Sequence, residues 1–120
     1  MATKGGVLLY ITENIIFKPR PDLEKVMTEA KYLESNFVEI INSKGKNNIV
    51  GVIYRHHTGN PVDFIESKLK TLLDGKLSKD LINKNIYLAG DFNVDLTNIS
   101  HQETSDFFYI MTTNQMLPII

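Results

Sequence analysis

The chain has 120 residues, of which 42% are apolar and 22% are charged, as in an ordinary globular domain. These proportions exclude a disordered or fibrous chain, and the length predicts one domain or part of one. The net charge of −1 provides no overall basic field, so any binding of nucleic acid would need a local basic patch.

The lack of cysteine and of long apolar runs excludes several further classes of protein. Without cysteine, disulfide frameworks, thiolate zinc sites and cysteine nucleophiles are excluded. No apolar run reaches the roughly 18–20 residues that a membrane span needs, and residues 1–6 lack the apolar core of a signal peptide. We therefore expect an intracellular protein without a membrane-spanning segment.

The first part of the chain predicts two short strands. Residues 7–11 form a continuous apolar run of strand length, which is typical of a strand buried on both faces. A turn is expected at residues 12–14, and a second strand over residues 15–18. Pro19 and Pro21 should stop that strand, because proline cannot donate a hydrogen bond to the ladder.

A β-hairpin is expected in the middle of the chain. Over residues 22–35, apolar side chains recur at helical spacing, but the interval is ambiguous. Residues 37–41 and 49–54 are strand-like, and the turn-forming residues 43–48 separate them, which predicts a hairpin. Glu39 alternates with apolar residues, so it should face solvent or a cation on a neighbouring strand.

The next predicted element is a helix. Asn60 followed by Pro61 indicates a helix start, because asparagine caps N–H groups and proline loses no hydrogen bond at the first helical position. One apolar stripe follows and should end near Gly75. This stripe consists of Phe64, Ile65, Leu69, Leu72 and Leu73.

The last part of the chain predicts a strand, a loop and a helix. Residues 86–89 indicate a short buried strand, 92–102 a loop and 104–115 a helix, and residues 117–120 look like the start of another strand. Helices that cross between apolar strands predict a mixed α/β fold in layers.

Candidate catalytic residues follow the strand over residues 86–89. Gly90 permits a tight turn at the carboxyl end of a strand, where open α/β folds place ligands. Asp91 and Asn93 lie two residues apart, so both side chains point to one side of an extended backbone. The carboxylate could take a proton from water or bind a metal, and the amide could orient that water or a phosphate oxygen. A loop in which both residues cap backbone N–H groups is a common alternative, and spacing alone leaves it open.

Two more candidates lie at the end of the strand over residues 49–54. The hydroxyl of Tyr54 could contact a phosphate, and so could the guanidinium of Arg55. A tyrosine at the edge of the core and a surface salt bridge are the structural alternatives. The histidines at 56, 57 and 101 do not predict a metal site, because adjacent histidines point opposite ways and the third is remote.

Several blocks occur together in a recognisable order: residues 5–11, 37–40, 52–56 and 90–96. The set resembles the endonuclease/exonuclease/phosphatase (EEP) domain, most closely the endonuclease of non-LTR (LINE-type) retrotransposons that precedes reverse transcriptase. The resemblance runs over nearly the whole chain. It implies an α/β (α+β) fold, part of a four-layer sandwich of the DNase I-like type, with two packed β-sheets flanked by helices.

The resemblance also implies a chemistry, the Mg²⁺-assisted (or Mn²⁺-assisted) hydrolysis of a DNA phosphodiester. By position, Asp91 would align and deprotonate the attacking water, and Asn93 would orient it or hold a phosphate oxygen. Tyr54 would contact the scissile phosphate, and Arg55 would help to bind substrate. His57 stands where the family usually has a proline.

Residues 1–120 are expected to be a single, partial domain of this type. Family members carry an asparagine and a metal-binding glutamate upstream of the Gly5-Gly6 pair, and a closing Ser-Asp-His block after the last helix. These 120 residues contain neither, so no metal ligand is identified and we expect a weakly active or inactive piece. The expected partners are DNA and the rest of an endonuclease–reverse transcriptase polyprotein, and the expected location is the nucleus.

Two alternatives stay open. The chain could be a non-catalytic remnant of the fold that binds nucleic acid or protein through its sheet, because missing strands leave open edges. It could also be a phosphatase on phosphoinositides or nucleotides, since relatives of this fold hydrolyse phosphomonoesters.

Overall fold

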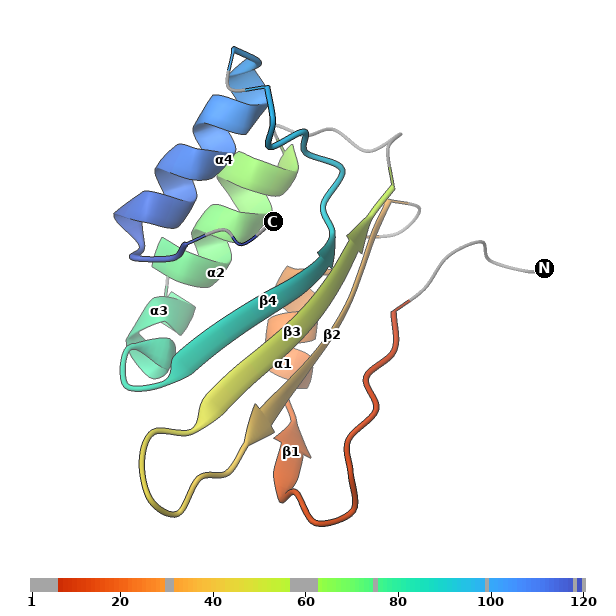
Figure 1. Cartoon of the computed structure of the whole chain (residues 1–120), viewed down its shortest axis with the longest axis vertical. Coiled ribbons are helices and arrows are strands. Elements are labelled where there is room, and N and C mark those ends of the chain that lie inside the picture. The colour runs from red at the N-terminus through yellow and green to blue at the C-terminus, as the bar shows by residue number, and fades with distance from the viewer. Residues whose placement is uncertain are drawn as a thin grey trace, which may run out of the picture.

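Figure 1 shows the chain as a computed structural model, which describes residues 7–29, 32–56, 63–74, 76–98, 100–117 and 119. In chain order, the elements are β1 (Phe17–Pro19), α1 (Pro21–Val26), β2 (Leu33–Ile40), β3 (Asn48–Arg55), the π-helix η1 (Asp63–Leu69), α2 (Lys70–Asp74), α3 (Lys76–Leu81), β4 (Asn85–Asp91) and α4 (Gln102–Thr113). The strands form a four-stranded sheet in the order β1-β2-β3-β4. The mixed α/β content predicted from the sequence is therefore confirmed.

The direction of the strands changes once across the sheet. The β1–β2 and β2–β3 pairs are antiparallel, and β2 with β3 forms the predicted hairpin, whereas β4 runs parallel to β3. A parallel pair needs a crossover connection, because the chain must return to the starting end of the sheet. Here η1, α2 and α3 make that crossover. The carboxyl ends of β3 and β4 consequently lie side by side (Figure 1).

One face of the sheet carries the hydrophobic core. Side chains alternate along a strand, so Ile49 and Ile53 point to this face and are fully buried. The buried apolar side chains of the described helices join the same cluster, which includes Leu23, Phe64, Leu69, Leu72, Leu81, Phe107 and Met111. Val50 and Val52 point to the opposite face and are only half-buried. The helices therefore cover one face and leave the other open.

Within the described ranges, the chain is two layers thick. It contains one sheet and one layer of helices, so the second sheet of the expected sandwich stays a prediction. None of the described helices is long and apolar enough to cross a membrane.

The prediction of a strand over residues 7–11 is wrong. Leu8 and Tyr10 are 65% and 89% exposed, and no described strand pairs with this segment. A strand needs a neighbour that takes up its backbone hydrogen bonds, and an apolar run cannot supply that neighbour by itself. The turn predicted next is present, since the N–H of Ile15 donates to the carbonyl of Thr12 at 3.1 Å.

Neither proline stops a strand in the way that was predicted. Pro19 is the last residue of β1, which an edge strand tolerates, and Pro21 opens α1 as its first residue. The ambiguous interval 22–35 divides into the short helix α1 and the start of β2. The strand predicted over residues 37–41 therefore begins earlier, at Leu33.

In the second half of the chain, the helices and strands agree more closely with those predicted from the sequence pattern. The apolar stripe forms η1 and α2, while Asn60, Pro61 and Gly75 lie outside the described residues. The strand over 86–89 and the last helix are confirmed as β4 and α4, but the pattern did not predict α3. Residues 117 and 119, predicted to begin a strand, are not in one.

Helix α4 ends with a residue in the left-handed conformation. Gln115 has a φ of 60°, and its N–H donates to the carbonyl of Thr112 at 3.1 Å. The N–H of Met116 donates to the carbonyl of Met111 at 2.8 Å, which completes a Schellman motif. Glycine usually occupies the left-handed position of this motif because it has no Cβ.

Gln115→Gly should therefore stabilise the fold by about 0.5–1 kcal/mol, because it removes the cost of a left-handed side chain. The measurement is the free energy of unfolding in urea. Ser105→Gly, an exposed position inside the same helix, is the control and should lower stability by about 0.5 kcal/mol. Equal losses for both variants would contradict the described helix end.

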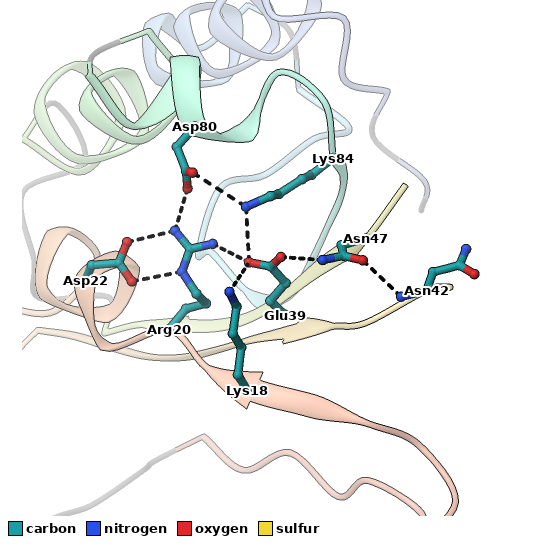
Figure 2. A network of polar contacts seen from close by, with 8 residues as sticks. All are labelled: Lys18, Arg20, Asp22, Glu39, Asn42, Asn47, Asp80 and Lys84. Carbon is teal, nitrogen blue, oxygen red and sulfur yellow. Dashed lines mark hydrogen bonds and ion pairs between the residues drawn. The ribbon is translucent and has the colours of Figure 1, made fainter. Parts of the chain in front are cut away.

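A buried charge network joins helices α1 and α3 to the sheet (Figure 2). Of the two environments expected for Glu39, the second is correct, because its side chain is 1% exposed and Lys18 Nζ, on the neighbouring strand β1, lies 3.9 Å from Glu39 Oε1. Arg20 Nη1 donates to Glu39 Oε1 at 2.6 Å, and Lys84 Nζ donates to the same oxygen at 3.2 Å. Asn47 Nδ2 donates to Glu39 Oε2 at 2.7 Å. Arg20 also donates to Asp80 at 2.6 Å, so one guanidinium joins the sheet to α3.

Candidate functional site

The candidate site lies at the carboxyl ends of β3 and β4. Tyr54 and Asp91 are direct partners in the parallel register, so their side chains point to the same face of the sheet. This is the open face, opposite the core, and adjacent strands are about 4.8 Å apart. Tyr54 is half-buried and Asp91 is exposed. No hydrogen bond engages the Tyr54 hydroxyl within the described part of the chain. A phenol donor and a carboxylate acceptor thus meet solvent side by side.

Gly90 allows this arrangement, because β4 passes very close to β3 just before Asp91. A Cβ at Gly90 would lie 1.9 Å from the carbonyl oxygen of Ile53, and the φ of Gly90 is +134°. No other residue type fits the space or favours this conformation. The glycine predicted to permit a turn therefore also permits the close approach of two backbones.

Asn93 is exposed and makes local hydrogen bonds at the end of the strand. It has a φ of 52°, and its N–H donates to Asp91 Oδ1 at 3.0 Å. Its Nδ2 donates to the carbonyl of Arg55. The Asp91 carboxylate thus caps a backbone N–H, as in the loop-cap alternative, with one oxygen turned toward the loop, whereas the Asn93 side chain bonds a carbonyl instead of an N–H. The orienting role expected for Asn93 in catalysis stays a prediction.

Arg55 is not on the surface, which differs from the place expected for a substrate-binding residue. Its side chain is 3% exposed, and Nε donates to the carbonyl of Phe92 at 2.6 Å. Nη2 donates to the carbonyl of Asn93, and the guanidinium lies 5.6 Å from the ring centre of Phe64. Burial lowers the pKa of Arg55, and the charges of Glu103 and Asp91 oppose that shift. The alternation of β3 turns Arg55 toward the core, so we regard it as a residue that positions the loop after β4.

The sequence pattern did not single out Glu34, which lies directly opposite Tyr54 on β2. His56 Nε2 lies 3.6 Å from Glu34 Oε2, and the His56 ring meets that of Tyr54 edge to face at 4.6 Å. Glu34, Tyr54 and Asp91 therefore form one row across β2, β3 and β4 on the same face of the sheet, and His56 lies against the first two. Glu34 comes next to Tyr54 only through the register of β2 with β3, and the sequence pattern does not predict that register.

The carboxylates and histidines at the site do not make a metal centre by themselves. Across the described ranges, no group of three or more such side chains is placed to hold an ion. The Mg²⁺ implied by the resemblance therefore lacks a full ligand set among the described residues. His57 lies outside the described residues, and His101 is 3.1 Å from Asn98 Nδ2, in the loop before α4.

A groove continues from the candidate site along the outer side of β4. Its volume is about 690 Å³, and it lies between β4 and the carboxyl half of α4. Most of the described residues that line it are apolar, including Leu88, Phe92, Leu96, Phe107, Met111 and Met116.

Comparison of the chain with protein-family models, with curated proteins and with solved structures finds no match. The geometry of the site and the ordered motifs therefore carry the functional argument.

Proposed function

We propose that this chain carries part of the catalytic centre of a metal-dependent phosphodiesterase of the EEP type, with DNA as its substrate. In this proposal it is a piece of a retrotransposon endonuclease–reverse transcriptase polyprotein and works in the nucleus. The observation that carries the proposal is the pairing of Tyr54 with Asp91 on one face, where two parallel strands end. The Gly90-Asp91-Phe92-Asn93 block supports it from the sequence.

The two side chains have complementary tasks in this chemistry. The exposed Asp91 carboxylate takes a proton from the attacking water. The Tyr54 hydroxyl donates a hydrogen bond to the phosphate, where negative charge grows in the transition state. Asn93 holds the end of β4 in place and ties it to β3. Its N–H donates to the Asp91 carboxylate, and its side-chain amide donates to the carbonyl of Arg55. The metal supplies charge neutralisation when the rest of its ligands are present.

The open face of the sheet supports the larger architecture. It carries Ile40, Val50 and Val52 beside Tyr54, and these apolar side chains are only half-buried. Two sheets that pack face to face bury such residues between them. The partial four-layer sandwich is therefore part of the proposal, with a second sheet on this face.

A non-catalytic binding role is the second candidate. It is favoured by the incomplete set of metal-binding side chains within the described ranges. In that case the chain should bind DNA in a salt-dependent way without cleaving it. No binding at low salt would exclude this version.

The first test uses the chain alone with supercoiled DNA and Mg²⁺. We expect little or no nicking, because a catalytic centre that acts as a unit fails when one member is missing. Strong nicking that EDTA stops and Asp91→Ala abolishes would show that our view of an incomplete site is wrong.

The second test joins the chain to the sequence encoded on either side of it in its genome. We expect Mg²⁺-dependent nicking that Asp91→Asn lowers at least about 100-fold and Tyr54→Phe at least about 10-fold. Asp95→Asn and Tyr87→Phe are matched controls. Asp95 caps Thr97 in the next loop, and Tyr87 lies on the same face of β4 but far from its carboxyl end. Equal losses for variants and controls would contradict the assigned roles.

A further inference from the structure

The Tyr54 ring needs a support that its own hydroxyl does not provide. The ring is half-buried on the open face of the sheet, and the hydroxyl makes no hydrogen bond to any other described residue. A side chain at such a position changes its χ1 rotamer readily unless neighbouring groups pack against it. The groups that contact the ring therefore decide where the hydroxyl points.

His56 supplies one such contact. The rings of Tyr54 and His56 meet edge to face, with their centres 4.6 Å apart. The residues lie two apart in the chain, so both side chains are on the same face. The backbone of His56 is held, because its N–H donates to the carbonyl of Tyr32 at 2.7 Å and continues the β2–β3 ladder past the end of β3. His56 can therefore brace Tyr54, provided that the His56 ring is itself held.

Glu34 is placed to hold the His56 ring. It lies on β2 opposite Tyr54, and its Oε2 is 3.6 Å from His56 Nε2. This oxygen is buried and makes no hydrogen bond with any group of the described ranges. A buried carboxylate oxygen without a partner is costly, so it attracts a cation or an N–H donor. The Nε2 of a histidine ring can be either one, depending on the charge and the tautomer of the ring. The attraction between the two side chains fixes the His56 ring against Tyr54.

We propose that Glu34 and His56 are positioning residues for Tyr54. Glu34 holds the His56 ring, and His56 keeps the Tyr54 ring in one rotamer on the face that it shares with Asp91. This inference rests on the proposed function, in which the Tyr54 hydroxyl donates to the phosphate. Neither Glu34 nor His56 touches the substrate in this scheme, so both act only through Tyr54.

The first experiment measures the χ1 rotamer of Tyr54 in the unmodified chain and its variants, from three-bond couplings in NMR spectra. The unmodified chain should give the couplings of one rotamer. Glu34→Leu and His56→Ala should give averages over several rotamers, whereas Glu34→Gln should keep one, because its amide oxygen still accepts from His56. The side chains of Glu34 and His56 are 35% and 24% exposed, so the fold should survive, and the amide spectrum checks this.

Glu66→Leu and His101→Ala are the matched controls for this experiment. Glu66 is exposed on η1, and His101 contacts Asn98 in the loop before α4. Neither control should change the Tyr54 couplings. Tyr87, on the same face of β4, is the internal reference and should have the same couplings in every variant. Unchanged Tyr54 couplings in Glu34→Leu and His56→Ala would overturn the proposal, and if one of these variants does not fold, the other decides.

The second experiment measures nicking by the chain joined to the sequence encoded on either side of it. Glu34→Leu should lower kcat about fivefold with little change in KM, because a misplaced hydroxyl weakens a contact that is made in the transition state. In a Tyr54→Phe background the same substitution should have almost no further effect, because the hydroxyl is already absent. A second fivefold loss in that background would show that Glu34 does not act through Tyr54, and would overturn the proposal.

The two experiments separate this proposal from the proposed function. If Tyr54→Phe nicks DNA as well as the unmodified protein does, the proposed function fails, and the couplings decide whether Glu34 and His56 position the ring. If the couplings do not change while Tyr54→Phe and Asp91→Asn lose activity, the positioning role fails and the proposed function stands.

Discussion

Gly90→Ala should destabilise the fold by at least about 3 kcal/mol and detach the end of β4 from β3. The added Cβ would lie 1.9 Å from the carbonyl oxygen of Ile53 and would also meet the backbone N of Ile53 at 2.9 Å. Neither backbone atom can move away as a flexible side chain could. The φ of +134° adds strain for any residue with a Cβ. The free energy of unfolding in urea measures the loss.

A second glycine provides the control for this substitution. Gly45 lies in the β2–β3 turn, where a Cβ would meet only the amide of Asn42 at 3.3 Å. Gly45→Ala should change stability by less than about 1 kcal/mol. In NMR spectra, Gly90→Ala should shift the signals of Ile53 and Asp91, its neighbours across and along the strand, more than those of α1. If Gly90→Ala is as stable as the unmodified chain, the close approach of β3 and β4 is wrong.

Glu39→Leu should lower the free energy of unfolding by about 1.5–3 kcal/mol, because Arg20 and Lys84 lose their most buried partner and keep only the half-exposed Asp22 and Asp80. Arg20 is 10% exposed and Lys84 is 19% exposed, and both donate to Glu39 Oε1. Adding Arg20→Met should restore a large part of the loss, since two well-packed apolar side chains then replace an ion pair. A double variant no more stable than Glu39→Leu alone would contradict the pairing of Arg20 with Glu39.

The same carboxylate predicts a pH dependence. Burial by itself raises the pKa of Glu39, but hydrogen bonds from Asn47, Arg20 and Lys84 outweigh it and lower the pKa from 4.5 to about 2. A carboxylate with a lowered pKa stabilises the folded state above its unfolded pKa. This contribution should therefore be complete above pH 4.5 and decline as the pH falls toward about 2. Urea unfolding between these pH values should show a smaller decline in Glu39→Gln.

The sequence by itself determined the local elements and the identity of the motif. Alternation and turn chemistry were enough for the β2–β3 hairpin, and the apolar stripe and periodicity were enough for α2 and α4. These elements are set by interactions between residues close in the chain. Residues 7–11 show the limit, because strand formation depends on a neighbour that lies elsewhere.

Only the tertiary structure decided which face each functional side chain occupies. Tyr54 and Arg55 are adjacent in sequence, yet one faces solvent beside Asp91 and the other is buried under the loop after β4. The parallel register that joins Tyr54 to Asp91 spans 37 residues and depends on the crossover through η1, α2 and α3. The hydrogen-bond donors to the Glu39 carboxylate come from three separate segments, at Arg20, Asn47 and Lys84. The physical reason is the same in each case, since packing and strand register are fixed by the whole core and not by the residues that the motif contains.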